Sequence, residues 1–261
     1  VYICETGGVP NALLIQQPDG TVRDVSAASN VDFLDLTRAA LLVDMDNDGD
    51  RDLVLSIRNA TVILANDGRG VFDPIPKLAA RTGTAAEFYS IAAADYDGDK
   101  WLDLYSVRYI RGTYGLTIPI PYFDAQNGPP NHLLRHLGDW RFEDVTESSG
   151  LAAGNNRFSL AASWQDIDQD GDQDLYVAND FGKAQLFVNN RGKFTEEAAV
   201  RGAANQAAGM GVSFGDFDGD QEPDLYVSNM FSASGARQMV RENYRPQDTP
   251  DQRRERLGHV M

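Results

Sequence analysis

The sequence predicts an all-β fold, a β-propeller built from four-stranded antiparallel blades, and three observations support this prediction. One acidic motif occurs four times along the chain. Each copy lies between a run of small or aliphatic residues and a run rich in β-branched and aromatic residues, as expected for two strands joined by a loop. A hairpin pattern with a glycine turn follows. Four strands repeated about every 50 residues are typical of propeller blades.

The four copies of the motif define four acidic loops. Each loop is followed directly by a leucine. Together with that leucine, the stretches are "DMDNDGDRDL" for loop I (44–52), "DYDGDKWLDL" for loop II (95–103), "DIDQDGDQDL" for loop III (166–174) and "DFDGDQEPDL" for loop IV (216–224). Every copy has Asp at positions 1, 3, 5 and 9 and Leu at position 10. A glycine at position 4 or 6 allows the chain to bend sharply. The loops therefore repeat one local structure, with the first strand before position 1 and the second beginning at position 9.

Strands are expected in a fixed order around each loop. First strands are predicted at 39–43, 90–94, 160–164 and 211–215, and hairpins of third and fourth strands at 62–75, 131–145 and 185–198. Residues 11–25 align with 131–145 without a gap, and residues 1–3 fit the end of a second strand. Residues 1–235 are thus predicted to hold a half blade, three full blades and a half blade, as a partial propeller. Residues 236–261 form an insert or tail, with a short basic helix from Thr249.

Composition narrows the classes of function. The 261 residues carry a formal net charge of −16, so no basic surface is available for nucleic acid. The sequence has no run of 18 apolar residues, so no membrane-spanning helix is predicted. Nineteen of the 39 acidic residues lie in the four loops, which is therefore where function is sought.

The spacing within the loops predicts calcium sites. Side chains at positions 1, 3 and 5 curl toward one point, position 7 can offer its backbone carbonyl, and position 9 closes the shell. Six or seven oxygen donors suit Ca²⁺, whereas zinc would require His or Cys, and an EF-hand would require Glu at position 12. A solvated acidic turn without an ion is the alternative, and four copies with one spacing argue against it. The candidate ligands are Asp44, Asp46, Asp48, Asp50 and Asp52; Asp95, Asp97, Asp99, Trp101 and Asp103; Asp166, Asp168, Asp170, Asp172 and Asp174; and Asp216, Asp218, Asp220, Glu222 and Asp224.

Bound calcium would also relieve charge repulsion. Two like charges about 4 Å apart repel by roughly 1 kcal/mol in water and by about 4 kcal/mol near a protein surface. Four Ca²⁺ ions add eight positive charges and would change the net charge from −16 to −8. We expect the ions to be structural, and the apo protein to be less stable. Loops in extracellular modules bind at about 10⁻⁴–10⁻³ M, which predicts an extracellular, cell-surface or periplasmic location.

The stretches "GVSFGDFDGDQEPDLYVSN" and "LFVNNRGKFTE" resemble FG-GAP/VCBS repeats, the calcium-loop blades also found in integrin α-subunit propellers. The "DLYVAN" and "DLYVSN" strands, with N-x-L-L hairpins, look more like the ASPIC/UnbV-associated group related to cartilage acidic protein. The resemblance covers roughly residues 11–230. It implies a propeller, usually seven-bladed, with loop carboxylates on calcium, in secreted or surface proteins. Phe-Gly precedes only loop IV and Gly-Ala-Pro is replaced, so integrin-like ligand recognition is not expected.

A partner is predicted on the face opposite the calcium loops. An insertion over 109–130 is rich in Tyr and Pro, and Tyr109, Tyr114, Tyr122 and Phe123 could stack on a sugar or grip a peptide. Packing over the propeller end is the alternative. The prediction is a scaffold for protein or glycan interaction, or for adhesion, with a carbohydrate-binding lectin as an alternative.

No catalytic activity is expected, because no nucleophile motif or phosphate loop occurs. His132 and His136 are predicted on one strand, where four residues span about 13 Å, so they cannot chelate one ion together. A propeller polysaccharide lyase or hydrolase is a further alternative. It would need a cleft with convergent basic and aromatic groups, for which Arg108, Tyr109 and Arg111 are the one cluster in the sequence.

Overall fold

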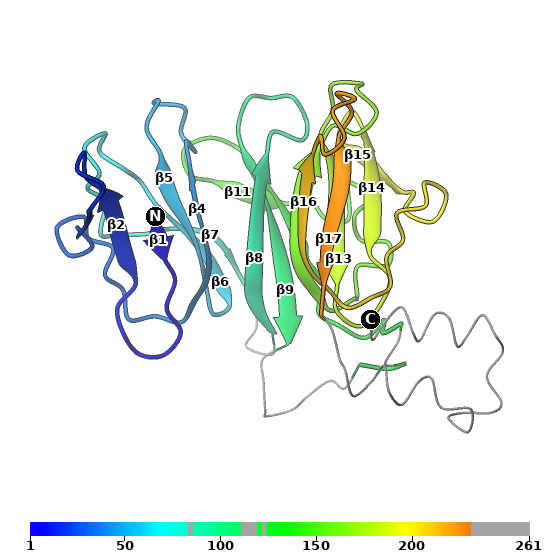
Figure 1. Ribbon diagram of the computed structural model, residues 1–261, viewed down its shortest axis with the longest axis horizontal. Helices are drawn as coiled ribbons and strands as arrows, with labels where there is room; N and C mark the ends of the chain where they lie inside the picture. Colours follow the sequence, from blue (N-terminus) through cyan, green and yellow to red (C-terminus); the bar gives the residue numbers. More distant parts are fainter. Residues whose placement is uncertain (83–85, 111–118, 122–123, 231–261) are drawn as a thin grey trace. The chain divides into compact units, whose positions relative to one another are not determined.

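The computed structural model describes residues 1–82, 86–110, 119–121 and 124–230 (Figure 1). Two compact units make up the chain: residues 1–106 with 132–145, and residues 107–131 with 146–261. Every regular element among the described residues is a β-strand, which confirms the all-β prediction. No helix in this described part has the length and hydrophobicity of a membrane span. The predicted basic helix and the boundary at 235/236 lie outside the described residues, and the predicted domain division stays a prediction.

The first unit contains three sheets whose strands follow one another in chain order. The first sheet comprises β1 (Tyr2–Ile3), β2 (Ala12–Gln16) and β3 (Val22–Asp24). The second comprises β4 (Thr37–Val43), β5 (Asp52–Ile57), β6 (Ala60–Leu64) and β7 (Lys77–Arg81). The third comprises β8 (Ala86–Ala94), β9 (Asp103–Ile110), β10 (His132–His136) and β11 (Phe142–Asp144). Only the first four residues of β9 belong to this unit.

The second unit contains two sheets with the same strand order. One comprises β12 (Ser159–Gln165), β13 (Asp174–Asn179), β14 (Gln185–Asn190) and β15 (Lys193–Glu196). The other comprises β16 (Gly209–Gly215) and β17 (Asp224–Asn229). Antiparallel four-stranded sheets in chain order are the predicted blade structure, and the described strands do not form a closed sheet.

Each acidic loop joins a first strand to a second strand, as predicted. The residue before position 1 pairs with position 9 in the antiparallel ladder, as in Val43 with Asp52, Gln165 with Asp174 and Gly215 with Asp224. The Asp at position 9 is therefore the first residue of the second strand, and the loop between the paired residues has a fixed length. In loops I, III and IV this constant register places the loop at the same end of the same two strands.

The second strands β5 and β13 are buried on both faces, which explains why they read as continuous apolar runs, whereas β17 is only partly buried. In the first unit, Leu53 and Leu55 of β5 belong to a core with Leu13 of β2, and the intervening Val54 belongs to a core with Leu104 of β9. Successive side chains of a strand point to opposite faces, so β5 contributes to both cores. Fully burying a side chain of this kind stabilises the fold by about 1.5–3 kcal/mol. In the second unit, Tyr176 of β13 is fully buried and anchors the core between its two sheets.

Two further devices recur at the start of the first strands. A β-bulge occurs between Thr37 and Ala39, between Ser159 and Ala161, and between Gly209 and Gly211. An asparagine before a third strand then bonds the first residue of the following sheet. Asn11 Nδ2 donates to Thr37 Oγ1 at 2.8 Å in the first unit, and Asn131 Nδ2 donates to Ser159 Oγ at 2.9 Å in the second. The ungapped alignment of the two N-x-L-L hairpins thus corresponds to a shared contact.

Candidate metal centres

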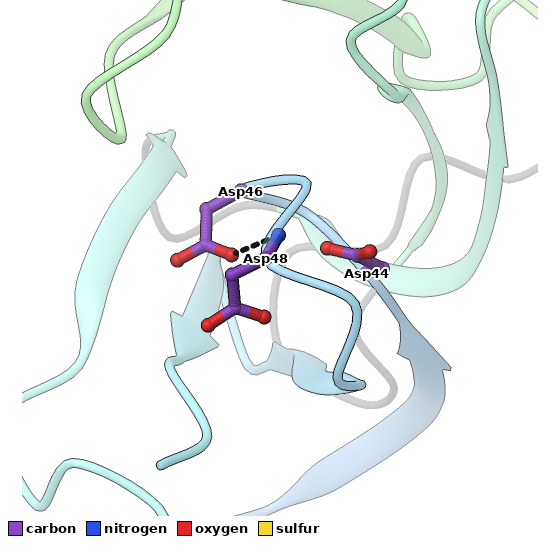
Figure 2. A group of neighbouring side chains, drawn as sticks. All are labelled: Asp44, Asp46 and Asp48. Carbon is purple, nitrogen blue, oxygen red and sulfur yellow. Dashed lines mark hydrogen bonds between the residues drawn. The ribbon is translucent and has the colours of Figure 1, made fainter. Parts of the chain in front are cut away.

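Three carboxylates converge in every acidic loop. In each group, one oxygen from each of three side chains lies within 4.8 Å of the others. Figure 2 shows the group in loop I, with Asp46 and Asp48 adjacent and Asp44 on the opposite side of the turn. The four groups are Asp44, Asp46 and Asp48; Asp95, Asp97 and Asp99; Asp166, Asp168 and Asp174; and Asp216, Asp218 and Asp224. Positions 1 and 3 therefore converge in all four loops, joined by position 5 in loops I and II and by position 9 in loops III and IV.

Backbone amides of the loop hold these carboxylates in place. In loop I, the amide of Asp48 donates to Asp46 Oδ1 at 3.3 Å (Figure 2). The amide of Asp50 donates to Asp48 Oδ1 at 3.0 Å. The amide of Gly49 donates to Asp44 Oδ2 at 3.0 Å. These turns are typical of Asp, whose short side chain reaches the backbone two residues on. In loop I, one oxygen of each of these three carboxylates is fixed by a loop amide, and the other remains available for a ligand.

Positions 4 and 6 are left-handed in all four loops. At position 4, φ is 62° at Asn47, 77° at Gly98, 59° at Gln169 and 85° at Gly219. At position 6, φ is 94° at Gly49, 75° at Lys100, 96° at Gly171 and 73° at Gln221. Each loop thus needs two residues in a conformation that suits glycine, and fills only one of the two positions with it.

The position of the glycine divides the loops into two classes. In loops I and III, with glycine at position 6, Asp44 Oδ1 and Asp166 Oδ1 are buried and have no hydrogen-bond partner. In loop II, with glycine at position 4, both oxygens of Asp95 accept backbone amides, from Gly98 at 2.8 Å and Lys100 at 2.9 Å. Asp216 of loop IV is bonded in the same way. A buried carboxylate oxygen without a partner is costly, and a cation would satisfy it.

The carboxylate at position 9 joins three strands. Asp174 is 1% exposed, and its two oxygens accept the amides of Ile167 in the loop at 2.9 Å and of Asn189 in β14 at 2.7 Å. Asp52 and Asp103 are bonded equivalently, to the amides of Asn66 and His136 on the third-strand side. Burial raises the pKa of Asp52 to about 6 and that of Asp103 to about 7. Position 9 is therefore a structural clamp, in addition to its predicted role as a ligand.

Electrostatics at position 3 favour a cation. Burial and the adjacent carboxylate of Asp48 raise the pKa of Asp46, and burial and the adjacent carboxylate of Asp99 raise the pKa of Asp97. A raised pKa means that the charged form is disfavoured where it stands. The donors are all oxygens, which suit a hard divalent cation, and the buried unpaired oxygens of Asp44 and Asp166 point to the same requirement. The loop residues therefore fit the predicted ion.

Position 7 differs from loop to loop, and its predicted role as a backbone-carbonyl ligand stays a prediction. Asp50 Oδ1 is buried without a hydrogen-bond partner. The Trp101 ring contacts His136 edge-on, with ring centroids 4.9 Å apart. Asp172 Oδ2 accepts the amide of Arg191 at 2.7 Å, and Glu222 accepts a hydrogen bond from Gln169. The side chains at this position thus contribute contacts of their own.

One charged residue near the loops escaped the sequence interpretation. Arg135 of β10 lies 2.7 Å from Asp97 and 3.0 Å from Asp99, through Nε and Nη2 respectively. At the equivalent place, just before the third-strand amide that bonds position 9, the other complete sheets have Ala65 and Val188. An arginine on a strand is ordinary, so only the register reveals where its side chain reaches.

The remaining candidates have structural roles where they are described. His132 and His136 lie on β10, as predicted; His132 Nδ1 is 2.6 Å from Asp144 Oδ2, and the His136 ring stacks on Phe142 at 4.5 Å. Tyr109 donates from its hydroxyl to Asp180 at 2.6 Å. Arg108 is buried and its Nη1 donates to the Pro130 carbonyl at 3.3 Å. The other proposed partner or cleft residues, Arg111, Tyr114, Tyr122 and Phe123, lie outside the described residues.

Comparison with solved structures finds similar chains, and two of them come from proteins of different function. An Agrocybe aegerita lectin that recognises non-reducing terminal N-acetylglucosamine matches with a TM-score of 0.50 and 16% identity, covering 87% of this chain and 56% of that one. Bacillus licheniformis rhamnogalacturonan lyase PL11 matches with a TM-score of 0.43 and 18% identity, covering 88% of this chain and 44% of that one. The chain thus spans about half the length of either structure. At 16% identity the likeness to the lectin concerns the fold alone. None of the curated proteins matches this chain.

A protein-family model assigns the acidic loops themselves. The FG-GAP-like repeat model matches residues 44–106 and 166–227. The first match runs from loop I through loop II, and the second from loop III through loop IV, so all four carboxylate groups lie within matched segments. The match agrees with the expected FG-GAP/VCBS resemblance, and the narrower ASPIC/UnbV grouping stays a prediction. Residues 44–106 and 166–227 are thus similar to FG-GAP-like repeats, and in each matched segment the acidic loops join a first strand to a second strand.

Proposed function

We propose that each acidic loop binds one Ca²⁺ and that the four ions fasten first strands to second strands in an extracellular or periplasmic binding scaffold. The observation that carries the proposal is the repeated convergence of three carboxylate oxygens within 4.8 Å in all four loops. Unpaired buried oxygens at Asp44 and Asp166 support it, because a cation would satisfy them. The expected millimolar-range affinity suits compartments outside the cytosol, where calcium is abundant.

The residues themselves account for the metal-binding chemistry. Positions 1, 3 and 5 would supply carboxylate oxygens, held by backbone amides, and position 9 would join them while clamping the third strand. Bound calcium supplies the positive charge that allows these carboxylates to stay ionised next to one another. Without it, the repulsion within each loop opposes closure of the first and second strands.

Calorimetry and thermal melting test this proposal together. We expect calcium titration of the chelator-treated protein to reveal about four sites and to raise the melting temperature. Binding that is selective for the native state stabilises it by about 2.7 kcal/mol at 100 times the dissociation constant. The variant Asp216→Asn with Asp218→Asn should lose one site and leave the other three.

A matched control is Asp139→Asn, because the Asp139 side chain is 95% exposed and lies outside the loops. This variant should keep all four sites and the full calcium response. Absence of binding heat in millimolar calcium, together with a melting temperature indifferent to chelator, would contradict the proposal.

The partner of the scaffold is proposed to be a protein or a carbohydrate bound on the side opposite the calcium loops. The hydroxyl of Tyr109 already donates a hydrogen bond to Asp180, so the contribution of Tyr109 to binding would come from its ring. Carbohydrate binding is the more readily tested alternative. A glycan array probed with the calcium-loaded protein, with Tyr122→Ala as comparison, would show glycan signals that the variant loses; unchanged signals would argue against the insertion as the binding surface.

A further inference from the structure

Loop II differs from the other loops because an arginine of its own sheet lies on its carboxylates. Arg135 Nε is 2.7 Å from Asp97 Oδ2, and Arg135 Nη2 is 3.0 Å from Asp99 Oδ2. The guanidinium therefore bridges positions 3 and 5 of the loop. Its side chain is 36% exposed, against 15% for Asp97 and 29% for Asp99, so the contact is partly shielded from water. Arg cannot lose its proton in a protein, and its fork geometry suits two carboxylate oxygens.

The strand register shows that this cation is specific to loop II. The clamping aspartate at position 9 accepts the amide of one third-strand residue in each complete sheet: Asn66, His136 or Asn189. The residue before that amide is Ala65 in the second sheet and Val188 in the sheet of β14, but Arg135 in the sheet of β10. Two equivalent positions thus carry small or apolar side chains that cannot neutralise a loop.

The oxygens that Arg135 occupies are those left available in loop I. In loop I, Oδ1 of Asp46 and Oδ1 of Asp48 accept loop amides, and their Oδ2 atoms contact no donor among the described residues. In loop II, Oδ1 of Asp97 and Oδ1 of Asp99 accept the equivalent amides, at 3.3 and 3.0 Å. Their Oδ2 atoms face Arg135 instead. The amide geometry is the same in both loops, and only the occupant of the second oxygens differs.

Two further contacts set loop II apart. Both oxygens of Asp95 at position 1 are already bonded to backbone amides, whereas Asp44 in loop I has one buried, unpaired oxygen. In loop III, Arg201 approaches only Asp168, at 3.5 Å, and makes its closer bond to Glu197 at 2.8 Å. Loop II is therefore the loop in which both the position-3 and position-5 carboxylates face a cationic side chain, within the part of the chain that the structure describes.

We propose that Arg135 is a tethered counter-ion of loop II, which competes with Ca²⁺ and makes loop II the weakest of the four sites. This inference rests on the proposed function, because it presupposes calcium binding in the loops. Calcium must displace the guanidinium from Asp97 and Asp99 or bind beside it. The same contact neutralises part of the loop's charge when calcium is absent. Loop II thus stays closed at calcium concentrations that leave the other loops without an ion.

The test replaces Arg135 by the residue type of the equivalent position. In Arg135→Val, we expect one of the four calcium sites to bind at least about tenfold more tightly, and the three other sites to be unchanged. Arg141→Ala is the matched control: Arg141 lies in the same hairpin, its side chain is 67% exposed, and its nearest acidic partner is Asp139 at 4.0 Å. It removes the same charge without touching loop II, so its four affinities should match those of the unaltered protein.

Tryptophan fluorescence assigns the change to loop II. Trp101 is part of that loop, and replacing Trp140 and Trp164 by Phe leaves it as the single tryptophan of the chain. Its calcium titration should shift to lower concentration in Arg135→Val and not in Arg141→Ala. In chelator, Arg135→Val should melt at a lower temperature than Arg141→Ala, because the empty loop has lost its counter-ion. Arg135→Gln, which keeps much of the length without the charge, replaces the valine variant if the latter does not fold.

Two failures can be told apart. If the unaltered protein binds no calcium at any loop, the proposed function is wrong. If it binds calcium but the Trp101 titration is the same with Val, Gln or Arg at position 135, or shifts equally in Arg141→Ala, the role of Arg135 is overturned and the proposed function stands.

Discussion

At the scale of single residues, the acidic loops explain why glycine shifts between two positions of the motif. Positions 4 and 6 both have a positive φ, yet each loop has glycine at only one of them. Asn47, Lys100, Gln169 and Gln221 occupy the other left-handed position. A non-glycine residue there costs roughly 1–2 kcal/mol, with Asn the best tolerated. Each loop therefore retains some backbone strain, which its hydrogen bonds and the proposed ion offset.

Gly49→Ala measures this strain at one position. The φ of Gly49 is 94°, and a Cβ there would meet no atom within 4 Å, so the cost comes from the backbone alone. We expect a loss of about 1–2 kcal/mol in the free energy of unfolding, measured by denaturant titration in calcium. Gly7→Ala is the control, because Gly7 also has open space and is not left-handed. Equal stabilities of the two variants would show that the loop relaxes around the new side chain.

The sequence predicted which residues make up the site more completely than it predicted the structural role of each residue. Positions 1, 3, 5 and 9 were identifiable because the motif occurs four times, and repetition separates fixed positions from variable ones. The clamp at position 9 was not foreseen, because its second partner, such as Asn189, is 15 residues away and is brought near by strand pairing. Arg135 was missed for the same reason: its importance depends on register, which no local pattern of charge reveals.

At the scale of elements, the position-9 aspartate converts a two-strand loop into a three-strand joint. Asp174 bonds an amide of its own loop and an amide of β14 with its two oxygens. Because Asn189 is buried and Ile167 is partly buried, both amides need an acceptor within the protein. The first, second and third strands are thus held together at one residue, next to the proposed metal.

Asp174→Asn tests this joint. An asparagine side chain can accept only one of the two amides and places its NH₂ group against the other, a mismatch that costs about 1–3 kcal/mol. Asp224→Asn is the matched variant, because Asp224 accepts one amide among the described residues, that of Phe217 at 2.8 Å, which an asparagine oxygen retains. In chelator, Asp174→Asn should lower the melting temperature more than Asp224→Asn, and should speed hydrogen exchange of the Asn189 amide. Equal losses would show that position 9 acts through the metal alone.

All strands flanking the loops were predictable from the sequence. The exact residues at which these strands begin and end depend on pairing with neighbouring strands, which local β-propensity does not reveal. The continuous apolar run "DLVLSI" identified β5, because both faces of that strand are buried. The bulges were not predicted, since nothing in "TRAAL" or "SLAAS" marks a register shift. They follow from pairing with the neighbouring strand.

At the scale of the whole molecule, the net charge of −16 makes stability depend on the state of its carboxylates. Burial raises the pKa of Asp52 to about 6 and of Asp103 to about 7, well above the ordinary value of 3.8. A group whose pKa is raised by folding stabilises the protein fully below the unfolded pKa, and this contribution is lost as the pH rises through the folded pKa. When no metal is bound, these two carboxyl groups therefore make the folded protein more stable near pH 4 than near pH 7.

His136 acts in the opposite sense. Burial lowers its pKa below 6.5, so its contribution is present above that value and is lost as the pH falls through the folded pKa. His136→Asn removes this opposing group and introduces the residue type found at the equivalent positions 66 and 189. Comparing the pH dependence of stability of His136→Asn with that of the unaltered protein separates the effect of the carboxyl groups from that of the histidine.

We expect the calcium-free His136→Asn variant to melt at a higher temperature at pH 5 than at pH 8, because protonation removes charge from buried carboxylates. Each kcal/mol of stability corresponds to about 2–4 °C for a protein of this size. Saturating calcium should remove or reverse this difference, because the ion stabilises the ionised form. Differential scanning calorimetry at both pH values, with chelator and with calcium, provides the measurement. A calcium-free variant that is more stable at pH 8 would contradict the assignment of these carboxyl groups.

The bulge in the first strands has a consequence for how such repeats diversify. It inserts one unpaired residue, Arg38, Leu160 or Met210, into ladders that are otherwise superimposable. In β4 this residue turns toward the following sheet of its unit, where Arg38 bonds Glu87 at 2.9 Å and lies 4.9 Å from the centre of the Tyr89 ring. A charged, aliphatic or thioether side chain is accommodated there without changing which backbone groups pair. A single substitution at the bulge position of a duplicated repeat could thus change which neighbouring sheet it packs against best. In designed arrays of repeats, the same position could be used to set the order in which the repeats pack.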